Sequence, residues 1–193
     1  MSAVWPARAA VATGRGAERL DLQALFAEHY DGVYRAAFRV LGTPDEAEDI
    51  AQETFVRLYR ESTARAAPHN VRAWLYRVAT NLALNAARAR SRRELRDAGG
   101  GPPQEETAPT DPLAELERHD EIARVRRALL MLSERDARML MLRHAGLSYR
   151  EVAAALGVAP GSIGTMLARA EAAFESAYAR RGGVDEEGVR DGL

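Results

Sequence analysis

The sequence predicts an all-α protein of two small helical domains joined by a flexible linker, the second being a helix-turn-helix domain. Apolar residues recur at helical spacing in several long segments. Most of these segments open on a capping residue or a proline. Between them, residues 97–111 are rich in Gly, Pro and acidic side chains without apolar periodicity. Such a composition is typical of a flexible linker.

The composition limits the classes of function. The chain has 193 residues, 47% of them hydrophobic, and a formal net charge of -1. This length favours one or two small domains, and the hydrophobic content favours packed cores. A nucleic-acid binder with so little net charge must concentrate its basic residues on one surface. The chain has no cysteine, which excludes disulfides, Cys-ligated zinc and thiol chemistry.

Membrane and enzyme classes are disfavoured. No apolar run approaches the roughly 20 residues that a membrane span needs, and residues 1–20 lack the apolar middle of a signal peptide. We therefore expect a cytoplasmic protein that does not contact a membrane. The four histidines are scattered, and neither an HExxH motif nor a phosphate loop occurs. We accordingly expect no enzymatic activity, no metal site and no cofactor.

The first domain is predicted over residues 21–96, after a loose tail at 1–20. Asp21 can cap a helix over 22–41, and Gly42 suits its end. A second helix over 44–60 starts with Thr-Pro-Asp-Glu, which combines a cap, a first-turn proline and a capping-box acid.

The second helix has an acidic outer surface. Its members follow the helical period and are Asp45, Glu48, Asp49, Gln52 and Glu53. Solvation and the helix dipole explain such a face, and so does docking of a basic partner. The residues of this helix leave both interpretations open.

A loop over 61–69 leads to a third, basic helix over 71–96. One stripe of this helix is apolar and consists of Val71, Trp74, Leu75, Val78, Ala79, Leu82 and Ala86. A second stripe carries amides and guanidiniums and consists of Arg77, Asn81, Asn85, Arg88 and Arg92. Arginine neutralises phosphate and asparagine can pair with base edges, so this face suits nucleic acid. A solvated helix surface is the alternative.

The second domain is predicted over residues 112–181, followed by a polar tail at 182–193. Its stretch LSYREVAAALGVAPGSIGTML contains two short helices and a glycine turn, which is the pattern of a helix-turn-helix. Ala153 is small where the helices cross, Gly157 allows the turn, and Ile163 packs back. Such a unit usually places its second helix in the DNA major groove.

Three segments in order resemble the extracytoplasmic-function sigma factors of bacterial RNA polymerase. They are DEAEDIAQETFVRLYR at 45–60, VRAWLYRVATNLALNAARAR at 71–90 and LSERDARMLMLRHAGLSYREVAAALGVAPGSIGTMLARA at 132–170. The resemblance covers residues 21–178. It implies an initiation factor that binds the clamp and flap of core RNA polymerase and recognises promoter DNA. It also allows for an anti-sigma partner on a separate chain.

The resemblance assigns roles to particular residues. Clamp docking would fall to the acidic helix, through Asp45, Glu48, Asp49, Gln52, Glu53 and Phe55. Promoter DNA near the melted segment would lie along Arg77, Asn81, Asn85, Arg88 and Arg92. The loop 61–69 would help to hold a base extruded from the non-template strand, which costs a few kcal/mol. The upstream element would meet the helix-turn-helix at Tyr149, Ser162, Thr165 and Arg169.

The chain also departs from the family pattern. Asn85 stands where relatives often have Asp. In the second domain Ala159 lacks a capping side chain, and Gly164, Met166 and Glu171 stand where relatives carry basic residues. We therefore expect a weak upstream contact with altered sequence preference. Two other hypotheses stay open: a helix-turn-helix repressor, and a protein-interaction adaptor derived from a sigma factor.

Overall fold

The computed structural model describes residues 20–64, 68–96 and 112–180. Within these ranges every regular element is a helix, which confirms the predicted all-α class. The elements are α1 (Leu22–Leu41), α2 (Pro44–Ala64), α3 (Val71–Arg96), α4 (Pro112–Met131), α5 (Glu134–His144), α6 (Tyr149–Leu156), the 3-10 helix η1 (Pro160–Ser162) and α7 (Ile163–Ala179). The predicted tails and linker lie outside the described residues, apart from Leu20.

Several helix ends follow the local rules that predicted them. A carboxylate oxygen of Asp21 accepts a hydrogen bond of 3.0 Å from the first turn of α1, and Gly42 ends that helix at φ 78°. At α6, Ser148 and Glu151 form a complete capping box, and Gly157 ends the helix at φ 66°. Both glycines adopt the left-handed conformation that disfavours a side chain.

Helix α2 runs one turn further than predicted. The sequence indicates an end at residue 60, but the helix continues to Ala64. Ser62 and Thr63 donate side-chain hydrogen bonds to the Tyr59 carbonyl oxygen, at 2.9 and 3.0 Å. These bonds satisfy polar side chains inside the last turn. The predicted 61–69 loop is therefore shorter, and its centre at 65–67 lies outside the described residues.

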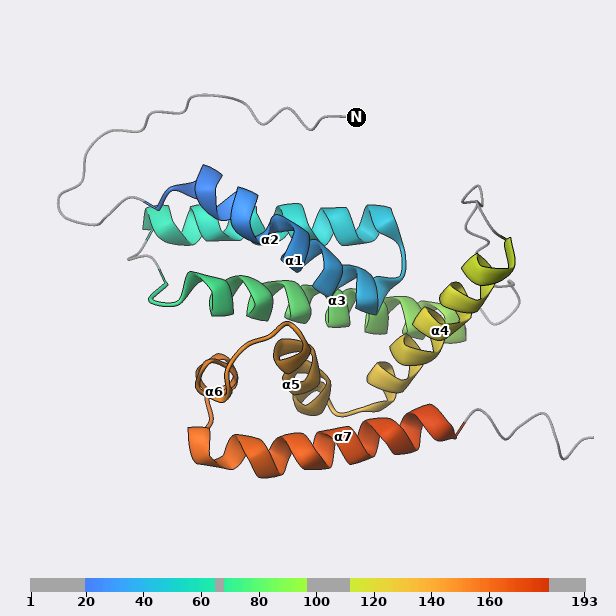
Figure 1. The fold of residues 1–193 in the computed structure, drawn as a ribbon. Helices are drawn as coiled ribbons and strands as arrows, with labels where there is room; N and C mark the ends of the chain where they lie inside the picture. The colour runs from blue at the N-terminus through green and yellow to red at the C-terminus, as the bar shows by residue number, and fades with distance from the viewer. Residues whose placement is uncertain (1–19, 65–67, 97–111, 181–193) are drawn as a thin grey trace, which may run out of the picture.

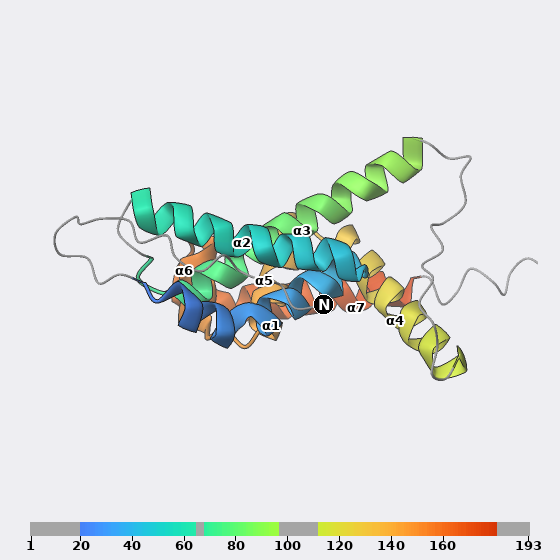
Figure 2. The same ribbon diagram turned by 90° about the horizontal axis from the view of Figure 1, so that it is seen from above.

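The helices form two units that pack directly on each other. We call α1–α3 the first unit and α4–α7 the second unit. Helix α3 lies between α1 and α2 on one side and α5–α7 on the other (Figure 1). Seen from above, the C-terminal end of α3 and the N-terminal end of α4 extend in different directions (Figure 2).

Three clusters of buried side chains hold this arrangement together. One belongs to the first unit and includes Val33, Leu58 and Leu75. The other two contain residues of both units: Leu84 of α3 shares a cluster with Met141 of α5. The third cluster joins α1 and α3 to α5, α6 and α7, and its members are Ala36, Ala73, Tyr76, Met139, Leu142, Leu147, Val152, Ala153, Ile163 and Leu167. The units therefore share apolar cores in this structure.

A polar contact ties α4 to the end of α1. The Leu41 carbonyl oxygen accepts hydrogen bonds from Arg90 of α3 at 2.6 Å and from Arg126 of α4 at 2.7 Å. The last carbonyls of a helix lack partners within the helix, so these two guanidiniums satisfy one of them. Arg126 thereby joins the second unit to the first.

The burial of α3 is broader than its sequence pattern predicts. Leu75 and Ala79 of the predicted stripe are buried, whereas Trp74 is only half-buried. A second buried row lies beside them and consists of Ala73, Tyr76, Thr80, Ala83, Leu84 and Ala87. The predicted single stripe was too narrow because α3 is covered by both units, and a helix packed on two sides buries residues on two faces.

Two glycine substitutions should change stability in opposite directions. A Cβ at Gly32 would lie 2.0 Å from the buried Tyr76 hydroxyl, whereas one at Gly164 would meet its nearest neighbour at 3.9 Å. We expect Gly32→Ala to lower the free energy of unfolding by about 1–3 kcal/mol through overpacking. Gly164→Ala should raise it by up to about 1 kcal/mol through helix propensity. Urea unfolding of both variants checks this, and equal signs would contradict it.

No single helix among the described residues is long and apolar enough to cross a membrane. One bent pair, Tyr149–Leu156 with Pro160–Ala179, passes the same test of length and composition. No group of three His, Cys, Asp or Glu residues in this part of the chain could hold a metal ion.

Candidate nucleic-acid interface

The acidic residues of α2 lie on the outside of the first unit. Most of the predicted face is exposed, and its members are Asp45, Glu48, Asp49, Gln52 and the half-buried Glu53. Gln52 donates a hydrogen bond of 3.0 Å to Glu48, and Glu53 pairs with Arg57 at 2.8 Å. Exposed pairs of this kind contribute little to stability. The face thus presents carboxylates and an amide without a structural need for them.

Phe55 differs from the expectation that it docks on a partner. Its side chain is 4% exposed and packs against Phe26 and Tyr30 of α1, with ring centroids 4.9 and 6.3 Å apart. An aromatic ring in the core cannot contact a partner directly. Phe55 is therefore corrected to a supporting residue that holds α2 against α1.

The basic stripe of α3 is divided by the packing of the second unit. Asn85 and Arg92 are exposed. Arg77, Asn81 and Arg88 are half-buried because α5 and α6 lie over this part of α3. The stripe is contiguous along the helix as predicted, but only two of its five side chains are exposed in this arrangement.

Arg88 is held by the second unit. It lies 3.3 Å from the Leu132 carbonyl oxygen in a hydrogen bond. Its Nη1 also lies 3.2 Å from a Glu134 carboxylate oxygen, in an ion pair without hydrogen-bond geometry. Glu134 in turn accepts a hydrogen bond of 2.7 Å from Arg138. The guanidinium of Arg88 is thus engaged by α5 and its preceding turn.

The N-terminal end of α3 makes a second polar contact with the second unit. Asn70 donates a hydrogen bond of 2.8 Å to Glu151, and Arg72 donates one of 3.0 Å to the Ala145 carbonyl oxygen. The Asn70 bond is the main reason that the pKa of Glu151 is lowered, with further contributions from Ser148. Hydrogen bonds to a carboxylate favour its charged form.

A hollow of about 560 Å³ lies where α2 ends and α3 begins. Its lining residues are Trp74, Arg77 and Val78 of α3 and Arg57, Arg60, Glu61 and Ala64 of α2, so three arginines face one carboxylate. It adjoins the 61–69 segment, to which the family resemblance assigns an extruded base. An indole beside guanidiniums can stack a base and neutralise its phosphate. Sequence reasoning placed Trp74 in the apolar stripe, although a half-buried Trp next to basic residues is a signal of such a surface.

Helices α6 and α7 form the predicted helix-turn-helix. The chain bends by 110° between them, within the range of this motif. Ala153 and Ile163 are buried at the crossing, as predicted.

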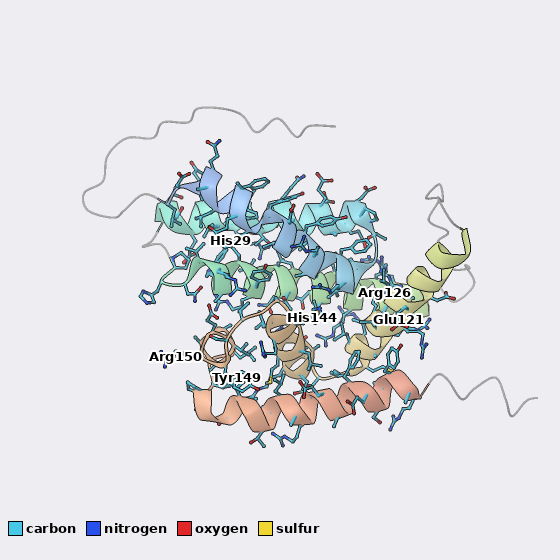
Figure 3. All side chains as sticks on the ribbon, viewed as in Figure 1. His29, Glu121, Arg126, His144, Tyr149 and Arg150 are labelled. Atoms are coloured by element: carbon cyan, nitrogen blue, oxygen red, sulfur yellow. The ribbon has the colours of Figure 1, made fainter. Side chains whose placement is uncertain are left out.

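The four candidate DNA contacts of this motif, Tyr149, Ser162, Thr165 and Arg169, are all exposed. Figure 3 shows Tyr149 between α6 and the start of α7. The Arg143 guanidinium lies over the Tyr149 ring, 5.6 Å from the ring centroid, in a cation–π contact.

The positions around the second helix of the motif that depart from the family pattern lack side-chain caps, and most of them are exposed. Neither Ala159 nor Ser162 makes a side-chain cap. Gly164 and Glu171 are exposed, so these positions face solvent. Met166 is half-buried, and its sulfur lies 3.6 Å from a guanidinium nitrogen of Arg135. Met166 is therefore partly committed to packing within the second unit.

Two family models match the chain. Residues 25–93 match Sigma-70 region 2, and residues 122–174 match Sigma-70 region 4. The first match covers most of the first unit, and the second match covers the helix-turn-helix with the end of α4.

Curated relatives carry the same family name. The chain is 36% identical over 162 residues to the ECF RNA polymerase sigma factor SigE of Mycolicibacterium smegmatis, covering 82% of this chain and 62% of SigE. It is 32% identical over 168 residues to the ECF RNA polymerase sigma factor SigL of Mycobacterium tuberculosis, covering 82% of this chain and 89% of SigL. The chain thus spans less than two thirds of SigE and most of SigL.

Two solved structures share the fold. One is the sigma factor RpoE in complex with the anti-sigma factor NepR from Bartonella quintana, with a TM-score of 0.55 and 23% identity, covering 81% of this chain and 96% of RpoE. The other is CnrH in complex with the cytosolic domain of CnrY, with a TM-score of 0.58 and 23% identity, covering 80% and 85%. At this identity the likeness concerns the fold alone.

Proposed function

The chain belongs to the extracytoplasmic-function family of RNA polymerase sigma factors, and from this membership we propose that it binds core RNA polymerase and directs it to specific promoters. The observation that carries the proposal is the order of two sigma regions along one chain. A plain helix-turn-helix repressor has no need of the first region. We further propose a cytoplasmic location and a role by binding, without catalysis.

The proposal divides the work between the two units. The first unit, with boundaries near 21–96, would dock on the clamp through the acidic face of α2. Its basic stripe on α3, with the Trp74 hollow, would hold the melted promoter. The second unit, near 112–181, would read the upstream element through Tyr149, Ser162, Thr165 and Arg169 and touch the flap. One solved neighbour is a complex with the anti-sigma factor NepR, and we propose an anti-sigma partner here too.

Promoter binding would require the two units to separate. Arg77 and Asn81 lie against α5 and α6, and Arg88 is held by Leu132 and Glu134. The second unit restricts the access of DNA to Asn81 and Arg88 while it covers them, and leaves Arg77 accessible only from the Trp74 hollow. We propose that core polymerase and promoter together favour an open arrangement.

The direct test is transcription with purified core polymerase on a pool of genomic promoter fragments, with start-site mapping. We expect discrete new start sites that core alone does not produce. No transcripts above core alone would reject the proposal and favour the adaptor hypothesis. Tight binding of a duplex operator without polymerase would favour the repressor.

Reversing charge on the acidic face should weaken polymerase binding without unfolding the protein. We expect Asp49→Arg with Glu53→Arg to weaken core binding about tenfold or more, because like charges across an interface are costly. Asp49 is exposed, and the half-buried Glu53 makes only a surface ion pair with Arg57, so stability should change by about 1 kcal/mol or less. Glu28→Arg with Asp31→Arg, two exposed acids of α1, is the matched control. If both variants bound core polymerase with equal affinity, the acidic face would be an ordinary solvated surface without a role in docking.

Arg92 and Arg88 should both contribute phosphate contacts, but only one should affect stability. Each alanine variant should flatten the log–log salt dependence of promoter binding by the holoenzyme by about 0.9. Arg92 is exposed, so Arg92→Ala should leave the melting temperature unchanged. Arg88→Ala should also lower the melting temperature, because Arg88 holds Leu132 and Glu134. Arg35→Ala on α1 is the control, and unaltered slopes for both variants would exclude backbone contact.

A further inference from the structure

A pocket of about 290 Å³ lies between the two units. Arg77, Thr80 and Asn81 of α3 form one wall, and Arg135 and Arg138 of α5 form another. Aliphatic side chains of α5 and α6 complete it, and no acidic residue lines it. Three arginines, a threonine and an asparagine therefore line a small space whose walls come from both units.

The charge of this pocket is only partly neutralised. Arg138 forms an ion pair with Glu134 at 2.7 Å, and the same Glu134 carboxylate also forms an ion pair with Arg88. Arg135 approaches the sulfur of Met166, which carries no charge. No described carboxylate lies within ion-pair distance of Arg77 or Arg135. Such a concentration of positive charge attracts a small anion, and a guanidinium fork fits the oxygens of phosphate.

Two buried polar atoms of residues that line the pocket lack hydrogen-bond partners. They are the hydroxyl of Thr80, a residue 1% exposed, and Nε of Arg138. Thr54 on α2 is equally buried, yet its hydroxyl donates to the Ile50 carbonyl oxygen at 2.7 Å. A buried threonine in a helix can thus donate its hydroxyl hydrogen to the carbonyl oxygen one turn earlier, but Thr80 does not make this hydrogen bond. Unpaired buried donors are rare in native proteins, and a bound ion or ligand is one explanation.

We propose that this pocket binds a small phosphate-bearing anion, held by Arg77, Arg135 and Arg138 with Thr80 and Asn81 as hydrogen-bond partners. The size of the pocket suits a ligand smaller than typical drug-sized ones. A single-stranded nucleic acid needs an open path along the backbone, whereas this pocket is walled by both units. The inference goes beyond promoter recognition: anion binding does not depend on polymerase activity, whereas the regulatory effect described next rests on the proposed promoter binding.

The position of the pocket gives the ligand a regulatory effect. Its binding groups come from both units, so the ligand binds only the packed arrangement. A ligand that binds one of two states shifts the population toward that state. The anion therefore keeps Arg77 and Asn81 away from DNA, and the two ligands compete.

The test is calorimetric titration of the full chain with inorganic pyrophosphate, at ionic strength held constant with chloride. We expect saturable binding of one pyrophosphate per chain. Arg135→Gln should weaken it about tenfold, since it removes one charge-assisted contact. Thr80→Val, which keeps the volume of the side chain, should weaken it about fivefold. Arg150→Gln is the matched control, because Arg150 is exposed and points away from the molecule (Figure 3).

The possible results are distinct. Site-specific loss in Arg135→Gln with unchanged binding in Arg150→Gln supports the pocket, even if Thr80→Val fails to fold. Equal loss in both arginine variants indicates a diffuse surface effect and overturns it. Absence of saturable binding also overturns it. So does binding of a single-stranded oligonucleotide that pyrophosphate does not displace, because the basic side chains then serve nucleic acid alone.

Discussion

Cross-linking the two units through Arg72→Cys and Ala145→Cys is expected to abolish promoter-directed initiation. The Arg72 guanidinium reaches the Ala145 carbonyl oxygen at 3.0 Å, so a short bismaleimide can join cysteines at these positions. The chain has no cysteine of its own, and the link therefore forms only at the introduced pair. With α5 and α6 fixed over α3, Asn81 and Arg88 stay covered and the basic stripe cannot bind DNA along its whole length. Transcript levels should fall to those of core polymerase alone.

The untreated double variant is the main control. It carries the same substitutions, so any loss of the Arg72 hydrogen bond affects both samples equally. Each single-cysteine variant treated with the same reagent controls for modification of one thiol. Full initiation by the cross-linked protein would show that the packed arrangement is itself active. It would also contradict the proposal that the two units separate, without contradicting the proposed sigma activity.

The helices themselves could be predicted from the sequence because their ends depend on neighbouring residues. Asp21 caps α1 as expected, Ser133 and Ser148 cap α5 and α6 by the same local rule, and Gly42 and Gly157 end α1 and α6. Each of these contacts spans at most four residues along the chain. A rule that depends on local geometry can be read from a single sequence. The C-terminal end of α2 could not be predicted by such a rule, because the last residues of the helix show no apolar periodicity.

The packing of the second unit on α3 could not be predicted in the same way. Arg88 and Leu132 are 44 residues apart, and Asn70 and Glu151 are 81 apart. Helical periodicity shows which residues share a face but not which distant element covers it. One signal was available: Ala73 lies outside the predicted stripe, and an alanine there allows a close approach of helices.

The chemical character of the candidate site could be predicted from the sequence, but not which of its side chains are accessible. The acidic and basic faces occur on α2 and α3 as expected. Phe55 was assigned to clamp docking because the motif of the resembling family was carried over as a whole, although its ring is buried and packs against Phe26. Arg77 was assigned to DNA, yet it also lines a pocket with Arg135. Such a shared position exists only in the folded chain, since the two arginines lie in different units.

Adding positive charge to the exposed side of α7 is expected to strengthen duplex binding markedly. Gly164 and Glu171 are exposed, whereas Met166 is partly packed, so the first two are the positions to change. Gly164→Lys with Glu171→Arg adds two cations and removes one repulsive acid. The log–log salt slope should steepen by about 1.8, as expected for two new phosphate contacts. Affinity in about 0.1 M salt should rise roughly tenfold or more. Fluorescence anisotropy with the full chain and a duplex of the mapped upstream element measures both quantities.

Gly164→Gln with Glu171→Gln separates charge from helix propensity at the same two positions. It replaces the glycine and the acid without adding a cation, so its salt slope should match that of the native chain. The contrary outcome is that the native protein already binds one specific duplex at sub-micromolar concentration near physiological salt and loses that preference in both variants. Gly164 would then allow a close backbone approach that a long side chain prevents. The departures from the family pattern would be a working recognition code, because affinity would come from base contacts where our prediction relies on phosphate.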